Sequence, residues 1–308
     1  MAYLTELTKR LLAKLSAMDP SRRQRHAAFL VGLQNADGGF SGRQGPSNPY
    51  YTSFALRALA LAGSLTHTVA HRAARYLRQQ IGRPLALVDL VSVVFAAGLL
   101  EAMTGAHVLG TAADIRRWLW ESLEALRRPD GGYAKTADSS TSSTYGTFLA
   151  VVSLELLEMP IAAPQQVAGL IRSRQRPDGG FVELDAMRHG GTNPTAAAVA
   201  VLRVLDACDT ACAQSAARFL LTMQNAEGGF RAHARIPLAD LLSTFTALAA
   251  LGDLGVLAQI DAQAARRFIA QCEDPQGGFG GGWGDAVPDA EYTFYGLGGE
   301  SLLSAAAH

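Results

Sequence analysis

A double-glycine turn that recurs five times is the feature that most constrains how this chain can fold. In each copy an acidic or amide residue and two glycines precede an aromatic residue, as in QNADGGF at 34–40 and RRPDGGY at 127–133. The first glycines of the five pairs lie 93, 48, 49 and 49 residues apart, at Gly38, Gly131, Gly179, Gly228 and Gly277. The first interval therefore spans two repeats, one of which lacks the turn and falls near residues 82–90. Periods of this length are typical of stacked helix pairs.

Each repeat combines two helices of different character. The first is amphipathic, as in HRAARYLRQQI at 71–81, and the glycines that follow can end it with positive φ angles. The second, such as STYGTFLAVVSLELL at 143–157, is apolar on nearly all sides and must be buried on both faces. We predict an all-α protein, an α/α barrel (toroid) of six helical hairpins with the apolar helices around its centre. An open superhelix is the alternative, and it would leave one side of those helices exposed.

The N-terminal segment predicts a separate helix. MAYLTELTKRLLAKL spaces its leucines helically among charged residues, which is not the pattern of a signal peptide. We expect residues 1–19 to form an amphipathic helix that packs on the barrel, and residues 20–308 to form a single toroid. Attachment of the helix to a membrane surface is the alternative.

Composition narrows the possible partners and the compartment. The chain has 27 basic and 27 acidic residues, so no basic excess indicates nucleic-acid binding. Its three cysteines are too few for a disulfide framework, which favours a reducing, cytoplasmic compartment. No run of about 18 uncharged apolar residues occurs, so we expect no membrane span.

The starts of the apolar helices should gather at one end of the barrel, where their N–H groups and dipoles meet any bound molecule. Tyr51, Tyr145 and Tyr292 lie at such starts and could line an apolar cavity with their hydroxyl groups inside. Packing in the core is the alternative role for these three tyrosines.

The repeat (Q/R)-x-x-(D/E)-GG-(F/Y) before an apolar helix resembles the β subunits of protein prenyltransferases. The squalene and terpene cyclases are similar in having the same barrel with a related Gln…Trp repeat. The resemblance covers residues 20–304 and five of the six repeats. It implies that the barrel binds an isoprenoid, such as a prenyl diphosphate, or a similar long apolar small molecule.

The family's zinc site is incomplete in this sequence. The prenyltransferases bind zinc through an Asp-x-Cys pair and a later histidine. Asp240 matches the aspartate, whereas Leu242 and Tyr292 stand at the cysteine and histidine positions. Zinc holds a substrate cysteine as its thiolate. We therefore expect no metal and no cofactor, and no zinc-dependent prenylation of cysteine.

The resemblance also implies residues that hold a diphosphate. HGGTNP resembles the family's His-Gly-Gly loop, so His189 matches its histidine and Arg188 lies beside it. Arg235 is the nearest match to an arginine that precedes the family's Asp-x-Cys pair. An exposed polar loop is the alternative setting for each of these three residues.

The candidate catalytic residues are two carboxyl groups, Asp240 and Glu291, which could act as acids at the mouth of the barrel. The Asp-x-Asp-Asp motif of the cyclases does not occur here. N-capping of the following helix is the alternative role of Asp240.

Three functions follow from these observations. The first is a protein that binds an isoprenoid in its central cavity and is independent of zinc if it is catalytic. The second is a non-catalytic scaffold or subunit that pairs with a helical partner protein. The third is a class II-like terpene cyclase that uses a lone carboxylic acid. The sequence leaves open whether the protein is an enzyme.

Overall fold

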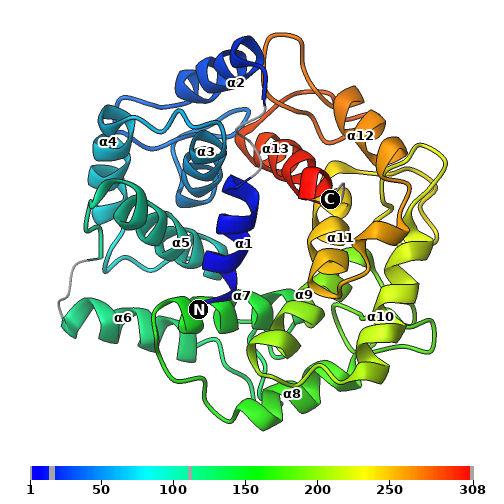
Figure 1. Ribbon diagram of the computed structural model, residues 1–308. Helices are drawn as coiled ribbons and strands as arrows, with labels where there is room; N and C mark the ends of the chain where they lie inside the picture. The colour runs from blue at the N-terminus through cyan, green and yellow to red at the C-terminus, as the bar shows by residue number, and fades with distance from the viewer. Residues whose placement is uncertain (1, 14–17, 110–112, 306–308) are drawn as a thin grey trace.

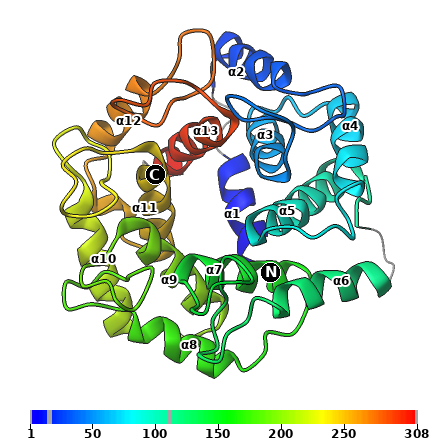
Figure 2. The same ribbon diagram turned by 180° about the vertical axis from the view of Figure 1, so that it is seen from behind.

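A computed structural model describes residues 2–13, 18–109 and 113–305 of the chain; the last residues of the expected toroid, 306–308, lie outside this part. In the described residues, six outer helices surround six inner helices. An additional helix at the N-terminus, α1 (Tyr3–Leu12), lies in the middle of the view (Figures 1 and 2). The outer helices are α2 (Pro20–Gly32), α4 (His67–Arg78), α6 (Ala113–Glu124), α8 (Pro164–Ser173), α10 (Thr210–Met223) and α12 (Ala262–Gln271). The inner helices are α3 (Pro49–Leu61), α5 (Leu87–Thr104), α7 (Thr144–Leu156), α9 (Thr192–Val204), α11 (Leu241–Asp253) and α13 (Ala290–Ala305).

The inner helices form a closed ring. Each packs against the next, and the last, α13, packs against the first, α3, as extensively as α3 packs against α5. The prediction of an all-α toroid of six hairpins is confirmed, and the open superhelix is excluded. The repeat without a double-glycine turn lies at α4 and α5, where Gly82 has a φ of +80° and the chain passes directly into α5.

In five repeats a double-glycine turn lies between the outer and the inner helix and packs against the next repeat. The first glycine of each turn has a φ between +90° and +112°, which residues with a Cβ rarely adopt. Four of the five turns, those of repeats 1, 4, 5 and 6, also press against the backbone of the following outer helix. A Cβ on Gly38 would collide with the carbonyl oxygen of Arg72, and one on Gly228 with that of Ala264. Glycine is therefore required both by the turn and by the close approach of the next repeat.

The aromatic residue of each turn is fully buried, and its backbone N–H has the same partner in all five copies. That partner is the hydroxyl oxygen of a buried threonine in the first turn of the inner helix, at 2.8–3.2 Å. The five pairs are Phe40–Thr52, Tyr133–Thr147, Phe181–Thr195, Phe230–Thr244 and Phe279–Thr293. This bond satisfies a buried donor and fixes the turn on the inner helix.

The ring closes through a charged network between the first and last repeats. Arg22 on α2 donates to the carboxylates of Glu273 and Glu300 at 2.6 Å each. The buried ring of His26 stacks on Phe279 and accepts a 3.0 Å hydrogen bond from the backbone of the sixth turn. These contacts hold α2 against the sixth repeat.

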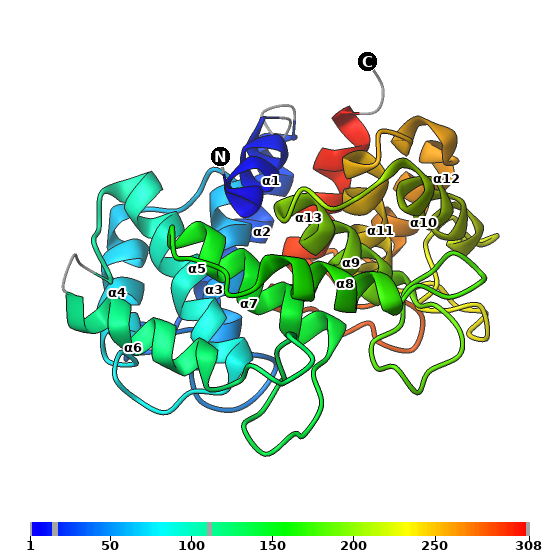
Figure 3. The same ribbon diagram turned by 90° about the horizontal axis from the view of Figure 1, so that it is seen from below.

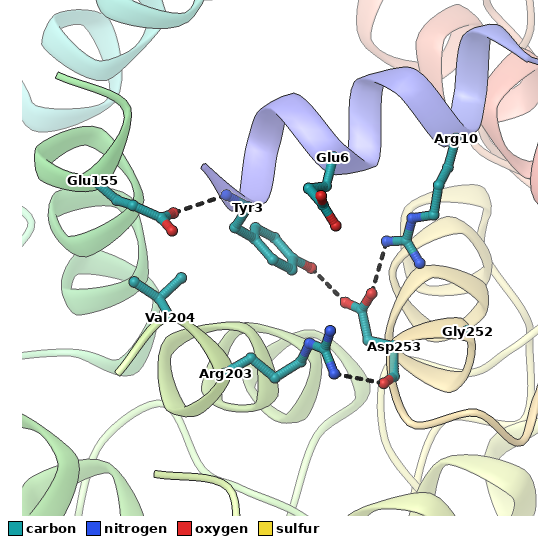
Figure 4. A pocket seen from close by; sticks show the side chains of 8 residues that line it. All are labelled: Tyr3, Glu6, Arg10, Glu155, Arg203, Val204, Gly252 and Asp253. Atoms are coloured by element: carbon teal, nitrogen blue, oxygen red, sulfur yellow. Dashed lines mark hydrogen bonds and ion pairs between the residues drawn. The ribbon is translucent and has the colours of Figure 1, made fainter. Parts of the chain in front are cut away.

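Helix α1 lies at one end of the ring, and the long loops that follow the double-glycine turns lie at the other end (Figure 3). Figure 4 shows the polar contacts of α1, which lie beside a small pocket of about 200 Å³. The Tyr3 hydroxyl and the Arg10 guanidinium both donate to the buried carboxylate of Asp253, at 2.7 Å each. The Tyr3 backbone N–H donates to Glu155 on α7 at 2.9 Å. The Ser301 hydroxyl on α13 donates to the Leu11 carbonyl, so three inner helices hold α1 in place.

Among the described residues, one helix, α5, has the length and apolar composition of a membrane span. In the fold α5 packs against α3 and α7 within the ring and against α4 outside it. Its position between three other helices accounts for its apolar character.

We predict that Glu273→Gln weakens the closure of the ring. Burial alone would raise the pKa of Glu273, but hydrogen bonds from His26 and Arg22 outweigh burial and lower it to about 2. Because the pKa is lower in the folded protein, the ionised carboxylate stabilises the fold at pH values above the pKa of the unfolded chain. This stability is lost as the pH falls towards about 2. The substitution should reduce the free energy of unfolding by about 1–3 kcal/mol near neutral pH. Urea denaturation would measure this change.

The difference between Glu273→Gln and the unsubstituted protein should shrink as the pH is lowered below about 4, where the unfolded carboxyl group takes up a proton. Glu121→Gln, on the exposed face of α6, is the matched control and should change little. An equal loss of stability at every pH would contradict the role of the charge.

Candidate functional site

The inner helices and α1 surround a central cavity of about 450 Å³ that is partly open. This volume lies within the range of small-molecule sites, and the lining is mainly apolar and aromatic, as is usual for such sites. Leu4 and Leu7 of α1 form part of the wall. The cavity therefore belongs to the ring and to the N-terminal helix together.

One side of the cavity is an aromatic cluster from three inner helices. Phe54 on α3, Phe245 on α11, and Phe294 and Tyr295 on α13 have ring centroids 5.2–5.8 Å apart. The α9 side is formed by small residues, which leave room for a ligand. The lining alanines of α9 are Ala196, Ala197 and Ala200.

Glu291, in the first turn of α13, is a carboxyl group that faces the cavity. It accepts a 2.6 Å hydrogen bond from the Tyr50 hydroxyl and a 3.2 Å bond from the Tyr295 hydroxyl. Burial raises the pKa of Glu291 and outweighs the two hydrogen bonds, which act in the opposite direction. A carboxyl group with a raised pKa inside an apolar cavity can donate a proton.

The loop end of the cavity carries an ion pair. Lys135 and Glu183 lie 2.6 Å apart, and the Lys135 ammonium stands 5.6 Å from the ring centroid of Tyr145. Tyr145 also lines the cavity and keeps about a third of its surface exposed. Because the two charges pair with each other, the net charge at this end is zero.

A second pocket, of about 340 Å³, lies beside the first at the rim. Arg43 bridges Asp285 at 2.5 Å and Asp289 at 3.1 Å, and its guanidinium lies 5.6 Å from the ring centroid of Tyr292. Tyr51 and Glu291 also line this pocket, so Glu291 separates it from the central cavity. Three of the predicted site residues, Tyr51, Tyr292 and Glu291, are thus brought together.

Asp240 has the geometry of a helix cap. It precedes α11, and its two carboxylate oxygens accept bonds from the backbone N–H and the hydroxyl of Ser243, at 2.7 Å each. Burial raises the pKa of Asp240. It lines neither of the two pockets described above.

The residues at the family's zinc positions do not fit a zinc ion. Asp240 uses both oxygens for Ser243, Leu242 contributes an apolar side chain to the cavity wall, and Tyr292 stands under Arg43. Zinc needs several nitrogen, sulfur or carboxylate ligands at about 2 Å. In the described part of the chain no group of three His, Cys, Asp or Glu side chains could hold a metal ion.

The residues predicted to hold a diphosphate lie elsewhere. Arg188 and His189 are exposed in the loop before α9, and Arg235 is exposed in the loop before α11. None of the three lines the central cavity or the rim pocket. Their role in binding an anion stays a prediction.

Arg57 is a lining residue that sequence analysis did not identify. It lies in the middle of α3 and faces the central cavity. The signal was available, because Arg57 is the one charged residue in the apolar segment YYTSFALRALALAG.

The sequence matches the family model of the prenyltransferase α/α toroid domain over residues 1–307, so the chain belongs to that family. No curated protein matches the sequence.

Similar solved structures include enzymes with isoprenoid ligands. The protein geranylgeranyltransferase-I of Candida albicans, complexed with GGPP, has a TM-score of 0.74 at 14% identity, with 91% of this chain and 90% of that chain covered. A variant of the type II terpene cyclase MstE from Scytonema, in complex with its substrate geranylgeranyl dihydroxybenzoate, has a TM-score of 0.62 at 14% identity, with 96% and 99% covered. A protein from Actinoplanes has a TM-score of 0.61 at 19% identity, with 94% and 100% covered. At such low identity these structures show the fold alone.

We predict that Glu291→Gln stabilises the protein more at high pH than at low pH. The pKa of Glu291 is higher in the folded protein than in the unfolded chain. The free energy of unfolding therefore falls as the pH rises and the buried carboxyl group ionises. Glutamine keeps an oxygen that can accept the Tyr50 bond and carries no charge. Urea denaturation at about pH 4 and about pH 8 should show the larger gain at pH 8. A gain that is the same at both values, or larger at pH 4, would contradict the raised pKa.

Proposed function

We propose that this protein binds an isoprenoid, or a similar long apolar small molecule, in its central cavity and does so without zinc. The observation that carries the proposal is the central cavity of about 450 Å³, lined mainly by aromatic rings and alanines with a few polar groups. Membership of the toroid family and the isoprenoid ligands of two similar structures support it. Burial of a long apolar chain in such a cavity is favourable by about 25 cal/mol per Å².

We predict that Ala197→Phe blocks binding of an isoprenoid. Ala197 lines the cavity on α9, so a phenyl ring there would occupy ligand volume. Geranylgeraniol and geranylgeranyl diphosphate should raise the melting temperature of the unsubstituted protein, and the substitution should weaken their binding at least about tenfold. Native mass spectrometry would count the bound molecules.

Ala270→Phe, on the exposed side of α12, is the matched control and should bind as the unsubstituted protein does. If neither isoprenoid shifts the melting temperature nor appears in the mass spectrum, the proposal is wrong.

A second candidate is a class II-like cyclase in which Glu291 is the acid. The supporting observation is its carboxyl group, which faces the cavity with a raised pKa. In such a step the Glu291 proton would form a C–H bond with the π electrons of an alkene, which would leave a carboxylate and a carbocation. Loss of a proton from the cyclised cation would restore the acid.

We predict for this candidate that a library of prenyl compounds yields a cyclised product with the unsubstituted protein and none with Glu291→Gln. The test is product analysis by gas chromatography and mass spectrometry. Glu121→Gln should retain the product. If the unsubstituted protein yields no cyclised product, the candidate is wrong and binding remains the proposed function.

A non-catalytic subunit with a helical partner also stays a prediction. Apolar side chains are exposed on three successive loops at the rim, including Leu184, Ile236 and Trp283, the last with 81% of its surface exposed. A partner would find its contact surface there, and co-purification of a stoichiometric protein would reveal it. The cytoplasm as the compartment stays a prediction from the small number of cysteines.

A further inference from the structure

Arg57 places a positive charge inside the ring. It lies eight residues after the start of α3, or about 12 Å below the helix N-termini at 1.5 Å per residue. Burial lowers the pKa of its guanidinium group. Part of the side chain remains accessible, and it lines the central cavity. An arginine keeps its charge even in such surroundings.

The guanidinium group of Arg57 has few partners in the protein. Its Nε donates a long 3.4 Å bond to the Ser53 carbonyl, and its Cζ lies 4.2 Å and 4.3 Å from the ring centroids of Phe54 and Phe294. Among the described residues, no hydrogen bond of its two terminal nitrogens and no ion pair of the side chain is found. Burial of a charge is costly unless an opposite charge or hydrogen bonds compensate it.

The other charged groups of the cavity are already engaged. Lys135 and Glu183 pair at the loop end. Glu291 accepts bonds from two tyrosine hydroxyls, and its raised pKa favours the neutral form. Arg57 is therefore the group that most needs an anion, and the four N–H donors of its two terminal nitrogens suit a carboxylate.

We propose that the natural ligand is an amphipathic monoanion, a long apolar chain with a carboxylate head group that binds against Arg57. This inference rests on the proposed function, since it specifies the head group of a molecule whose chain fills the same cavity. One unpaired cation balances one negative charge, so the site fits a carboxylate better than a diphosphate. The chain would lie across the cavity against the alanines of α9 and the phenyl rings of Phe95 and Phe148.

The test compares geranylgeranoic acid with geranylgeraniol, which have the same chain and differ in the charge of the head group. Isothermal titration calorimetry should show that the protein binds the acid about 10- to 100-fold more tightly, because hydrogen bonds to charged groups are strong. Arg57→Met should remove this preference and leave the affinity for the alcohol largely unchanged. Arg57→Lys should restore only part of it, because an ammonium group has no planar fork.

Arg267→Met, on the exposed side of α12, is the matched control and should keep the full preference. A second measurement is the stability of the ligand-free protein. If the charge of Arg57 serves a ligand, Arg57→Met should hold or raise the melting temperature, since a buried charge without an anionic partner is removed.

Three results would overturn the inference while the proposed function stands. One is equal affinity for acid and alcohol. The second is an acid preference that Arg57→Met leaves unchanged, together with a lower melting temperature that assigns Arg57 to packing against Phe54 and Phe294. The third is tighter binding of geranylgeranyl diphosphate than of the acid, dependent on Arg57. If neither the acid nor the alcohol binds, both the inference and the proposed function are wrong.

Discussion

The contact between a double-glycine turn and the backbone of the next outer helix recurs around the ring, and the central cavity depends on it. The turn reverses the chain with a positive φ, and its lack of Cβ atoms lets the following repeat approach closely. The same contact closes the circle, since Gly277 of the sixth turn meets the backbone of Arg25 in the first outer helix. Each inner helix is thereby held beside the next, and a cavity remains along the axis.

The position of α1 shows how the N-terminus completes that cavity. Leu4 and Leu7 line the cavity, the Tyr3 and Arg10 side chains bind Asp253, and the Tyr3 backbone N–H binds Glu155. A ligand inside the ring would therefore contact an element from outside the six repeats. The loop end, where the Lys135–Glu183 pair and Tyr145 lie, is the other boundary of the cavity.

The sequence was sufficient to predict the fold because the repeated double-glycine turn makes the contact between successive repeats. The spacing of the glycines predicted six hairpins, and apolar inner helices predicted a closed ring. The site was harder to predict. Tyr51, Tyr292 and Glu291 do share a pocket, as their places at helix starts suggested, but resemblance to a diphosphate loop led to Arg188 and His189, which are exposed. A family motif gives a position along the chain, whereas the direction of a side chain depends on how its own loop packs.

Arg57 and Glu291 face the same cavity, so the charge state of one affects the other. The Arg57 cation favours the ionised form of Glu291, which burial disfavours. It would also repel a carbocation formed near Phe54 and Phe294, the rings that would otherwise stabilise such a charge. A ligand carboxylate on Arg57 would cancel that repulsion and would raise the pKa of Glu291 further. The anion that satisfies Arg57 would therefore also keep Glu291 protonated, and binding and acid chemistry in this ring would depend on the same head group.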